Sequence, residues 1–165
     1  MTVQAEHLTG HVSQLLKLCR DKSIMLRTAE SCTAGAIAAT IASVSGASDV
    51  LDRGWIVYSN QAKHQELGID KSLIEAHGAV SQQVVEAMAR GGSASGIACV
   101  AVSGIAGPSG GTQDKPVGTV WIAVALGRHI CASRCCHFDG DRLQVQLATV
   151  FESIRMLIEC VEARF

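Results

Sequence analysis

Residues 24–35 read IMLRTAESCTAG, and the alanine-rich stretch AIAATIA follows directly over residues 36–42. A short apolar run ends in a cluster of small polar residues, and helical spacing begins behind it. This order predicts a strand over residues 24–28, a tight junction, and a helix over about residues 33–43. Ser31 lies at the junction, where unpaired backbone N–H groups and the positive end of the helix converge. Its hydroxyl is predicted to act either as a helix cap or as a nucleophile beside an oxyanion site.

Helices alternate with strands along the rest of the chain. Further strands are expected over residues 54–58, 97–102, 117–126 and 129–138. Further helices are expected over residues 12–20, 61–67 and 71–76, from a cap at Ser81 to about residue 92, and from about 141 to 165. The apolar strand 97–102 is expected at the centre of the sheet, and the last two strands form a hairpin. The predicted fold is α/β, a three-layer α/β/α sandwich with a mixed sheet, as one domain over residues 1–165.

The composition is that of a globular protein rich in small residues. Of the 165 residues 48% are hydrophobic and 18% charged, and the formal net charge is −1. This balance gives no electrostatic argument for a nucleic-acid partner, and no apolar run is long enough to span a bilayer. The first residues lack the basic-then-apolar layout of a secretory signal. A cytoplasmic protein with neither nucleic acid nor membrane as partner is expected.

Seven cysteines occur, an odd number with no CxxC pair. Cys131, Cys135, Cys136 and His137 form a loose cluster, but strand alternation places Cys135 and Cys136 on opposite faces. Paired ligands at short spacing, which a zinc site needs, are therefore absent from the sequence pattern. The cysteines are predicted to be small buried hydrophobic residues, and no metal site is expected.

The surroundings of Ser31 favour a ligand site over a simple cap. Consecutive small polar residues occupy a position where one cap, worth about 1 kcal/mol, would suffice. The junction also follows a strand, and ligand sites of α/β proteins form outside the carboxyl ends of strands. Ala34 and Gly35 leave the first turn uncrowded, so a ligand can approach the backbone, and Thr33, Ala34 and Gly35 are predicted to contact the substrate.

A second candidate group follows the strand predicted over residues 54–58. Tyr58 is the only tyrosine and is expected to reach the same rim as Ser31. Asn60 is expected to cap the next helix and to contact the substrate. Lys63 falls in the first turn of that helix, where the positive end of the helix dipole disfavours an ammonium group. Lys63 is thus a candidate general base, with a solvated surface lysine as the alternative.

A glycine-rich loop follows the apolar strand. Its backbone N–H groups are suited to an anion, although the Walker pattern is missing. The GPSGG stretch over residues 107–111 fits G-x-S-x-G, but neither a strand directly before nor a helix directly after the serine is expected, which excludes a nucleophile elbow. The loop is either purely structural or a cradle for phosphate and sugar. The candidate binding residues in it are Ser103, Gly104, Ala106 and Gly107.

The segment FDGDR over residues 138–142 precedes the last helix. Asp141 is predicted to cap that helix. Arg142 is predicted either to bind a phosphate or to pair with Asp139. The histidines are scattered and none accompanies a serine and an acid, so a Ser-His-Asp triad is not supported.

Several motifs, taken in order, resemble a known family. They are TAESCTAG (28–35), RGWIVYSNQAK (53–63), HGAVS (77–81), AVSGIAGPSGGTQDKPVGTVW (101–121) and FDGDR (138–142). Together they resemble the CinA C-terminal domain family, whose stand-alone form is similar to nicotinamide-nucleotide amidohydrolases. The resemblance implies an α/β/α sandwich that hydrolyses the amide of nicotinamide mononucleotide (NMN) to nicotinic acid mononucleotide and ammonia, with no metal and no cofactor.

By this resemblance the nucleophile is Ser31, assisted by Lys63 and Tyr58. Two positions depart from the family pattern. Ala34 stands where a glycine is frequent, which is expected to crowd the substrate pocket slightly. Gln146 stands where an arginine is frequent, which leaves part of a basic phosphate pocket open to question.

The resulting hypothesis is amide hydrolysis through an acyl-enzyme on Ser31. The expected partners are a small nucleotide as substrate and, in a homo-oligomer, a second copy of the chain. Trp55 and Ile130 are candidates for that contact, although placement in the core is favoured. Two alternatives remain open from the sequence. One is a non-catalytic nucleotide-binding or regulatory module, and the other is an amidase for another pyridine amide.

Overall fold

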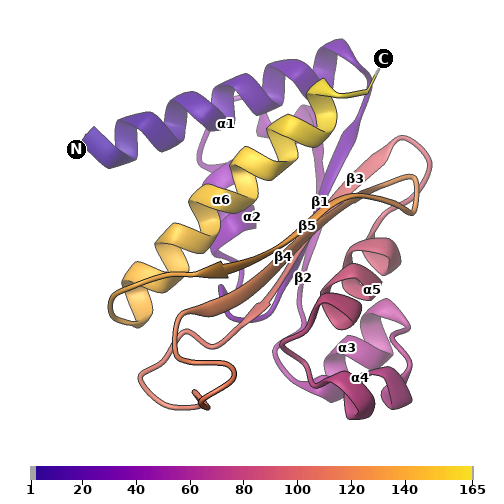
Figure 1. Ribbon diagram of the computed structural model, residues 1–165. Helices are drawn as coiled ribbons and strands as arrows, with labels where there is room; N and C mark the ends of the chain where they lie inside the picture. Colours follow the sequence, from indigo (N-terminus) through magenta and orange to yellow (C-terminus); the bar gives the residue numbers. More distant parts are fainter. Residues whose placement is uncertain (1–2, 165) are drawn as a thin grey trace.

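The computed structural model describes residues 3–164, which form a five-stranded mixed sheet with helices on both faces (Figure 1). The strands are β1 (Met25–Glu30), β2 (Leu51–Ile56), β3 (Ile97–Gly104), β4 (Thr119–Leu126) and β5 (His129–His137), in the spatial order β2-β1-β3-β4-β5. β1 pairs in parallel with β2 and β3, whereas β3, β4 and β5 are antiparallel to one another. The predicted mixed sheet is confirmed.

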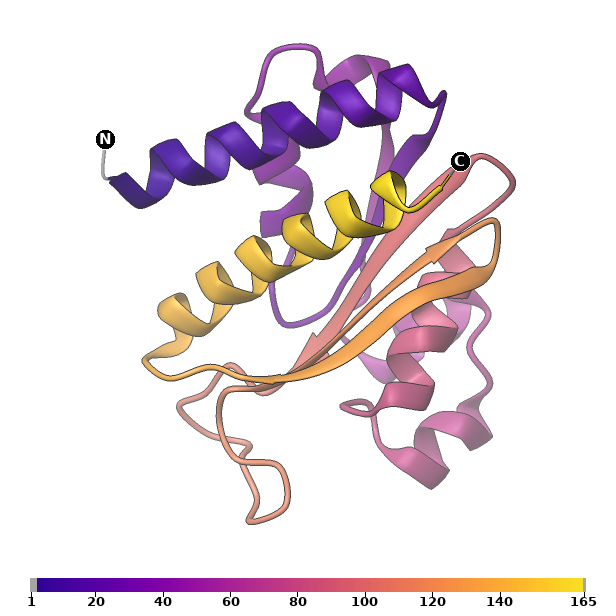
Figure 2. The same cartoon turned by 45° about the horizontal axis from the view of Figure 1, so that its top comes forward.

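Two apolar cores separate the sheet from its helices, so the three layers are confirmed as well. One core lies under α1 (Val3–Asp21), α2 (Ala36–Ala42) and α6 (Arg142–Glu162). The other lies under α5 (Gln82–Gly92), with α3 (Asn60–Leu67) and α4 (Lys71–His77) beside it. Figure 2 shows α1 and α6 running side by side over the sheet, and the Gln14 amide donates to Glu162 between them. Strand β3 is covered on both faces, as its apolar sequence predicted.

Helix boundaries agree best where a cap is present. Ser81 caps α5, Gly78 ends α4, and Asp141 caps α6 in a capping box with Gln144. α1 extends well before the predicted start at residue 12. The predicted end of the last helix at Phe165 lies outside the described residues, within which α6 ends at Glu162.

Three boundaries near the junction differ from prediction. β1 continues to Glu30, because its pairing with β2 and β3 extends that far. α2 begins only at Ala36, since the residues before it form a turn. β2 covers Leu51–Ile56 instead of residues 54–58, so Tyr58 lies beyond the strand. The cap of α3 is Ser59, whose hydroxyl accepts from the Ala62 N–H at 3.0 Å, and the prediction of Asn60 as the cap is wrong.

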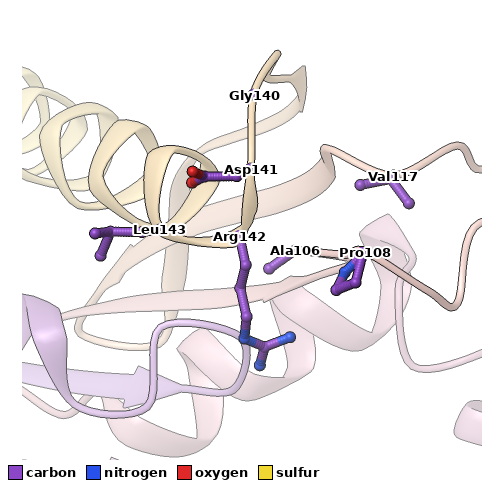
Figure 3. A pocket seen from close by; sticks show the side chains of 7 residues that line it. All are labelled: Ala106, Pro108, Val117, Gly140, Asp141, Arg142 and Leu143. Atoms are coloured by element: carbon purple, nitrogen blue, oxygen red, sulfur yellow. The ribbon is translucent and has the colours of Figure 1, made fainter.

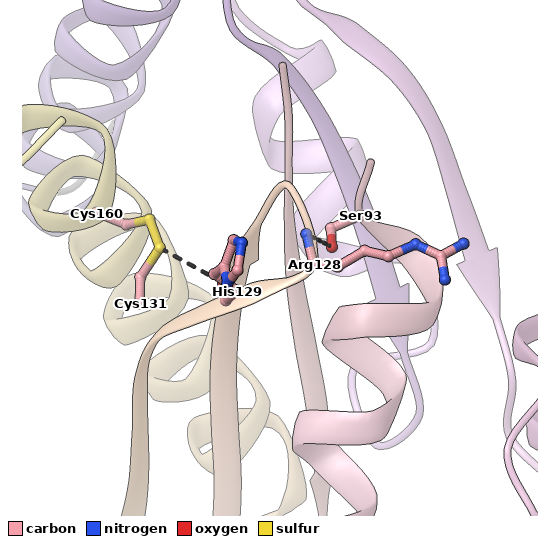
Figure 4. The surroundings of a disulfide bond; sticks show 5 residues. All are labelled: Ser93, Arg128, His129, Cys131 and Cys160. Carbon is pink, nitrogen blue, oxygen red and sulfur yellow. Dashed lines mark hydrogen bonds between the residues drawn. A yellow bond between two sulfur atoms is a disulfide. The ribbon is translucent and has the colours of Figure 1, made fainter. Parts of the chain in front are cut away.

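The cysteines only partly follow the prediction of buried apolar side chains. Cys19, Cys32 and Cys99 are buried. Cys131 on the edge strand β5 instead forms a disulfide with Cys160 of α6 (Figure 4). Their Cα atoms are 5.8 Å apart, within the range that a disulfide requires. Cys135 is exposed on the same strand and the next residue, Cys136, is half-buried, because successive side chains of a strand point to opposite faces.

Two residues considered for a subunit contact, Trp55 and Ile130, pack against the core under α5, as favoured from the sequence. Within residues 3–164, no helix combines the length and the apolar character that crossing a membrane requires.

Candidate active site

Ser31 and Lys63 meet at the carboxyl end of β1. Ser31 follows the last residue of the strand and is 8% exposed, whereas Lys63 projects from α3 and is 1% exposed. The Lys63 Nζ lies 3.2 Å from the Ser31 Oγ. It also donates to the carbonyl oxygens of Val57 at 2.9 Å and Tyr58 at 3.3 Å. The interpretation of Lys63 as a solvated surface lysine is therefore wrong.

Burial dominates the electrostatics of this lysine. Removal from water disfavours the ammonium form and lowers the pKa of Lys63 from its usual value. No carboxylate pairs with it among the hydrogen bonds and ion pairs of residues 3–164. A neutral amine has two N–H donors and one lone pair, and the two carbonyl oxygens match the donors. In that neutral form the lone pair faces the Ser31 hydroxyl proton, whereas in the ammonium form the third N–H donates to the Ser31 Oγ.

The neighbouring carboxylate of Glu30 organises the turn that carries Ser31. Glu30 is completely buried and accepts the Thr33 hydroxyl at 2.6 Å. It also accepts the backbone N–H groups of Gly35, Ile37 and Ala38 at 2.9–3.0 Å. These are N–H groups at the start of α2 that have no partner within the helix. The charge of Glu30 thus satisfies the beginning of α2 from within the core.

The helix-cap interpretation of Ser31 is wrong for the same reason. Gly35 holds the N-cap position of α2 and no side chain hydrogen bonds from that position. The role of Glu30 was not predicted from the sequence. A signal was present, since an acidic residue directly before an alanine-rich helix complements the positive helix end.

The turn between Ser31 and α2 has a strained backbone. Ala34 has φ +51° and Gly35 has φ +99°, and the first of these is unusual for a residue with a Cβ. The Ala34 side chain is exposed at the turn. A Cβ at Gly35 would lie 3.1 Å from Cδ1 of Ile56, so glycine fits this position by both conformation and space.

Tyr58 occupies the outer rim of the site. Its side chain is 54% exposed, and its hydroxyl accepts a hydrogen bond from the Arg142 guanidinium. Only the backbone carbonyl of Tyr58 contacts Lys63. The structure thus brings Tyr58 to the same end of the sheet as Ser31, but joins its hydroxyl to Arg142.

Arg142 links the rim to the glycine-rich loop, donating also to the Gly107 carbonyl at 2.8 Å. It does not pair with Asp139 among the ion pairs of the described residues. A hollow of about 580 Å³ lies here, and the Arg142 side chain extends from the start of α6 past Ala106 (Figure 3). The residues lining the hollow are Ala106, Pro108, Val117, Gly140, Asp141, Arg142 and Leu143.

Most of the predicted binding residues do not line this hollow, among them Ser103, Gly104 and Asn60. Ser103 is 1% exposed and its hydroxyl donates to the Ala79 carbonyl at 2.7 Å. Gly104 is inside β3, where an added Cβ would lie 2.6 Å from Val120. Asn60 is exposed at the first residue of α3.

Cys32, next to Ser31, carries a buried thiol. Burial raises the pKa of the Cys32 thiol to about 12, which leaves it protonated at neutral pH. Its backbone carbonyl accepts the side-chain amide of Gln146 at 2.8 Å. This hydrogen bond connects α6 with the turn that carries Ser31.

The structure is a mixed α/β sandwich with a buried serine–lysine pair at the end of a strand. Known proteins are similar to this chain over most of its length. The family model of the CinA C-terminal domain matches residues 8–161. A Pseudomonas putida protein named nicotinamide-nucleotide amidohydrolase PncC is 44% identical over 154 residues, covering 92% of this chain and 96% of that protein. The chain belongs to the CinA C-terminal domain family.

Longer relatives and solved structures agree with this membership. A putative competence-damage inducible protein of Caldicellulosiruptor bescii is 40% identical over 159 residues, covering 92% of this chain but only 38% of that protein. The crystal structure of competence/damage inducible protein CihA from Agrobacterium tumefaciens superposes with a TM-score of 0.87 at 34% identity, covering 93% of this chain and 94% of the other.

Proposed function

We propose that this chain hydrolyses the carboxamide of NMN to nicotinic acid mononucleotide and ammonia, with Ser31 as the nucleophile. The observation that carries this proposal is the 3.2 Å distance between the Lys63 Nζ and the Ser31 Oγ in a buried setting. The substrate follows from the name of the Pseudomonas putida relative, with which this chain shares 44% identity over nearly the whole length of both.

In the first step Lys63, in its neutral form, takes the proton of Ser31 while Oγ attacks the carboxamide carbon. The C–O bond forms and the carbonyl oxygen takes up the negative charge of a tetrahedral intermediate. Backbone N–H groups of the turn after Ser31 stabilise that charge. A donor of this kind is worth about 3 kcal/mol in serine hydrolases.

In the second step the C–N bond breaks. The Lys63 ammonium returns its proton to the departing nitrogen, and ammonia leaves an ester on Ser31. Water then attacks the ester with Lys63 again as the base, which releases the carboxylic acid and restores the hydroxyl. The same two atoms, Ser31 Oγ and Lys63 Nζ, therefore serve both halves of the reaction.

We assign Arg142, Tyr58 and the loop around Gly107 to the ribose phosphate end of the substrate. A guanidinium suits phosphate because its N–H groups form paired hydrogen bonds with two oxygens. Tyr58 belongs to this group in the proposal, because its hydroxyl bonds to Arg142. Holding the phosphate positions the carboxamide at Ser31 and lowers the entropic part of the barrier.

The proposal is tested by ammonia release from the purified chain with NMN, nicotinamide riboside and nicotinamide as substrates. We expect turnover of NMN well above that of the two compounds that lack phosphate. Binding of NMN without ammonia would contradict hydrolysis and favour a regulatory module. Faster turnover of nicotinamide would favour an amidase for another pyridine amide.

A further inference from the structure

The backbone N–H groups around Ser31 are not all used by the fold. The Ser31 N–H donates to the Val102 carbonyl at 3.2 Å, and the Ala34 N–H donates to the Ser31 carbonyl at 3.1 Å. The Gly35 N–H donates to the Glu30 carboxylate at 3.0 Å. Between them, the N–H groups of Cys32 and Thr33 have no acceptor on any other residue in the described chain 3–164, and the Cys32 N–H contacts only its own thiol.

Such unpaired donors are unusual at buried positions. Cys32 is 4% exposed and Thr33 is 3% exposed, and buried N–H groups are almost always hydrogen bonded. Two consecutive donors that lack an acceptor on any other residue, directly after a candidate nucleophile, therefore indicate an acceptor that arrives with the substrate. The N–H of the residue after the nucleophile is a place where other serine hydrolases bind the oxyanion.

Side chains from two distant parts of the sequence hold these donors in place. On one side, Glu30 accepts the Thr33 hydroxyl at 2.6 Å. On the other side, the Gln146 amide donates to the Cys32 carbonyl at 2.8 Å, across 114 positions of sequence. The Cys32 carbonyl and the Thr33 N–H belong to one trans peptide unit, so they point in opposite directions.

The Gln146 hydrogen bond therefore has two effects on the Thr33 N–H. It fixes the rotation of the peptide plane, and it polarises the peptide so that the N–H becomes a stronger donor. A non-donating side chain at this position would leave the carbonyl unpaired and the plane free to turn.

We propose that the N–H groups of Cys32 and Thr33 form the oxyanion hole and that Gln146 is the positioning residue that aims the second of them. This assignment rests on the proposed function of Ser31 as a nucleophile. Gln146 acts through the Cys32–Thr33 peptide and does not touch the reacting atoms.

Three variants test the assignment. Gln146→Met keeps the side-chain size and removes the donor, whereas Gln146→Arg keeps an N–H donor. Gln14→Met removes a similar amide hydrogen bond, the one to Glu162 on the far part of α6, and is the matched control. For each variant, kcat and KM are measured on NMN. The rate at which a fluorophosphonate labels Ser31 is followed by intact-protein mass spectrometry.

The fluorophosphonate reports on the site without the natural substrate, because its phosphoryl oxygen takes the oxyanion position. We expect Gln146→Met to lower kcat and the labelling rate about tenfold, with KM unchanged within about twofold. This is less than the loss of about 10²–10³ on removing a donor outright. Gln146→Arg is expected to remain within about threefold of the wild type, and Gln14→Met within about twofold.

Equal kcat and labelling rates in Gln146→Met and Gln14→Met would overturn the assignment. A raised KM at unchanged kcat would also overturn it, because Gln146 would then bind the substrate. The wild type could release no ammonia from NMN while the fluorophosphonate still labels Gln146→Met more slowly than the wild type. In that case the proposed substrate fails and the oxyanion assignment stands. A crystal structure of the adduct with the phosphoryl oxygen away from both N–H groups would refute it directly.

Discussion

The Nζ of Lys63 lies 3.2 Å from the Oγ of Ser31, although 32 positions of sequence separate the two residues. The parallel pairing of β1 with β2 brings their carboxyl ends to one edge, and α3 then returns the lysine under that edge. Burial and two carbonyl acceptors restrict the amine to one orientation.

The pH dependence of the reaction is expected to report the titration of Lys63. In the proposed mechanism the deprotonated amine is the active base, so kcat/KM is expected to rise with pH through the pKa of Lys63 in the free enzyme. Burial lowers that pKa, so the midpoint of the rise lies below the usual lysine value of about 10.4. The Cys32 thiol, with a pKa of about 12, does not interfere in this range.

Lys63→Arg is the matching variant for the pH experiment. Arginine keeps the donors for the Val57 and Tyr58 carbonyls but does not give up its proton. We expect it to lose at least about 10²-fold in kcat at every pH from 6 to 10 while retaining a folded circular dichroism spectrum. A Lys63→Arg variant with wild-type kcat would show that Lys63 is no base.

Glu30→Gln is expected to lower the free energy of unfolding by about 2–4 kcal/mol. In the wild type the Glu30 carboxylate accepts hydrogen bonds from the Thr33 hydroxyl and from the N–H groups of Gly35, Ile37 and Ala38. The amide of the variant would place an NH₂ donor against some of these donors. Urea unfolding measures the loss. Glu75→Gln, at an exposed position of α4, serves as the control and is expected to change stability by less than about 0.5 kcal/mol. Equal stability of both variants would contradict the role given to Glu30.

Arg142→Ala is expected to act on the phosphate end of the substrate. A charged hydrogen bond to phosphate is worth about 1.5–3 kcal/mol, which corresponds to a rise in KM for NMN of about 10- to 100-fold. For nicotinamide riboside, which lacks the phosphate, the variant and the wild type should have similar KM values. The control is Arg90→Ala, which removes a surface ion pair with Glu86 on α5. An equal loss on both substrates would place Arg142 at another part of the ligand.

Cys160→Ser is expected to destabilise the oxidised protein, because the Cys131–Cys160 disulfide joins β5 to α6 across 29 positions. A cross-link of this span contributes about 3–4 kcal/mol through the unfolded chain. Urea unfolding with and without a reducing agent measures it, and reduction should lower the wild type to the level of the variant. Cys135→Ser is the control, since this exposed cysteine is unpaired in the described structure. If the oxidised wild type were no more stable than Cys160→Ser, the disulfide would not stabilise the fold.

Much of the architecture was predictable because its signals are local. The apolar strands, the capping residues Ser81 and Asp141, and the glycine at residue 78 each fix an element from neighbouring residues alone. Ser31 and Lys63 were predictable as candidates because both follow strands whose ends share one edge of the sheet.

The remainder depends on side-chain contacts between distant segments. The family resemblance implied that Tyr58 assists the serine, and in the structure its hydroxyl accepts a hydrogen bond from Arg142, 84 positions away. The Gln146 contact with the Cys32 carbonyl and the disulfide across β5 and α6 depend equally on how α6 packs over the sheet. No periodicity or spacing rule carries that information.

The most direct test of the account is ammonia release from NMN by Ser31→Ala, measured beside Ser43→Ala, which removes an exposed hydroxyl at the other end of α2. We expect Ser31→Ala to fold normally and to lose at least about 10³-fold in kcat, and Ser43→Ala to stay within about twofold of the wild type. Turnover of Ser31→Ala at the level of Ser43→Ala would contradict a serine nucleophile.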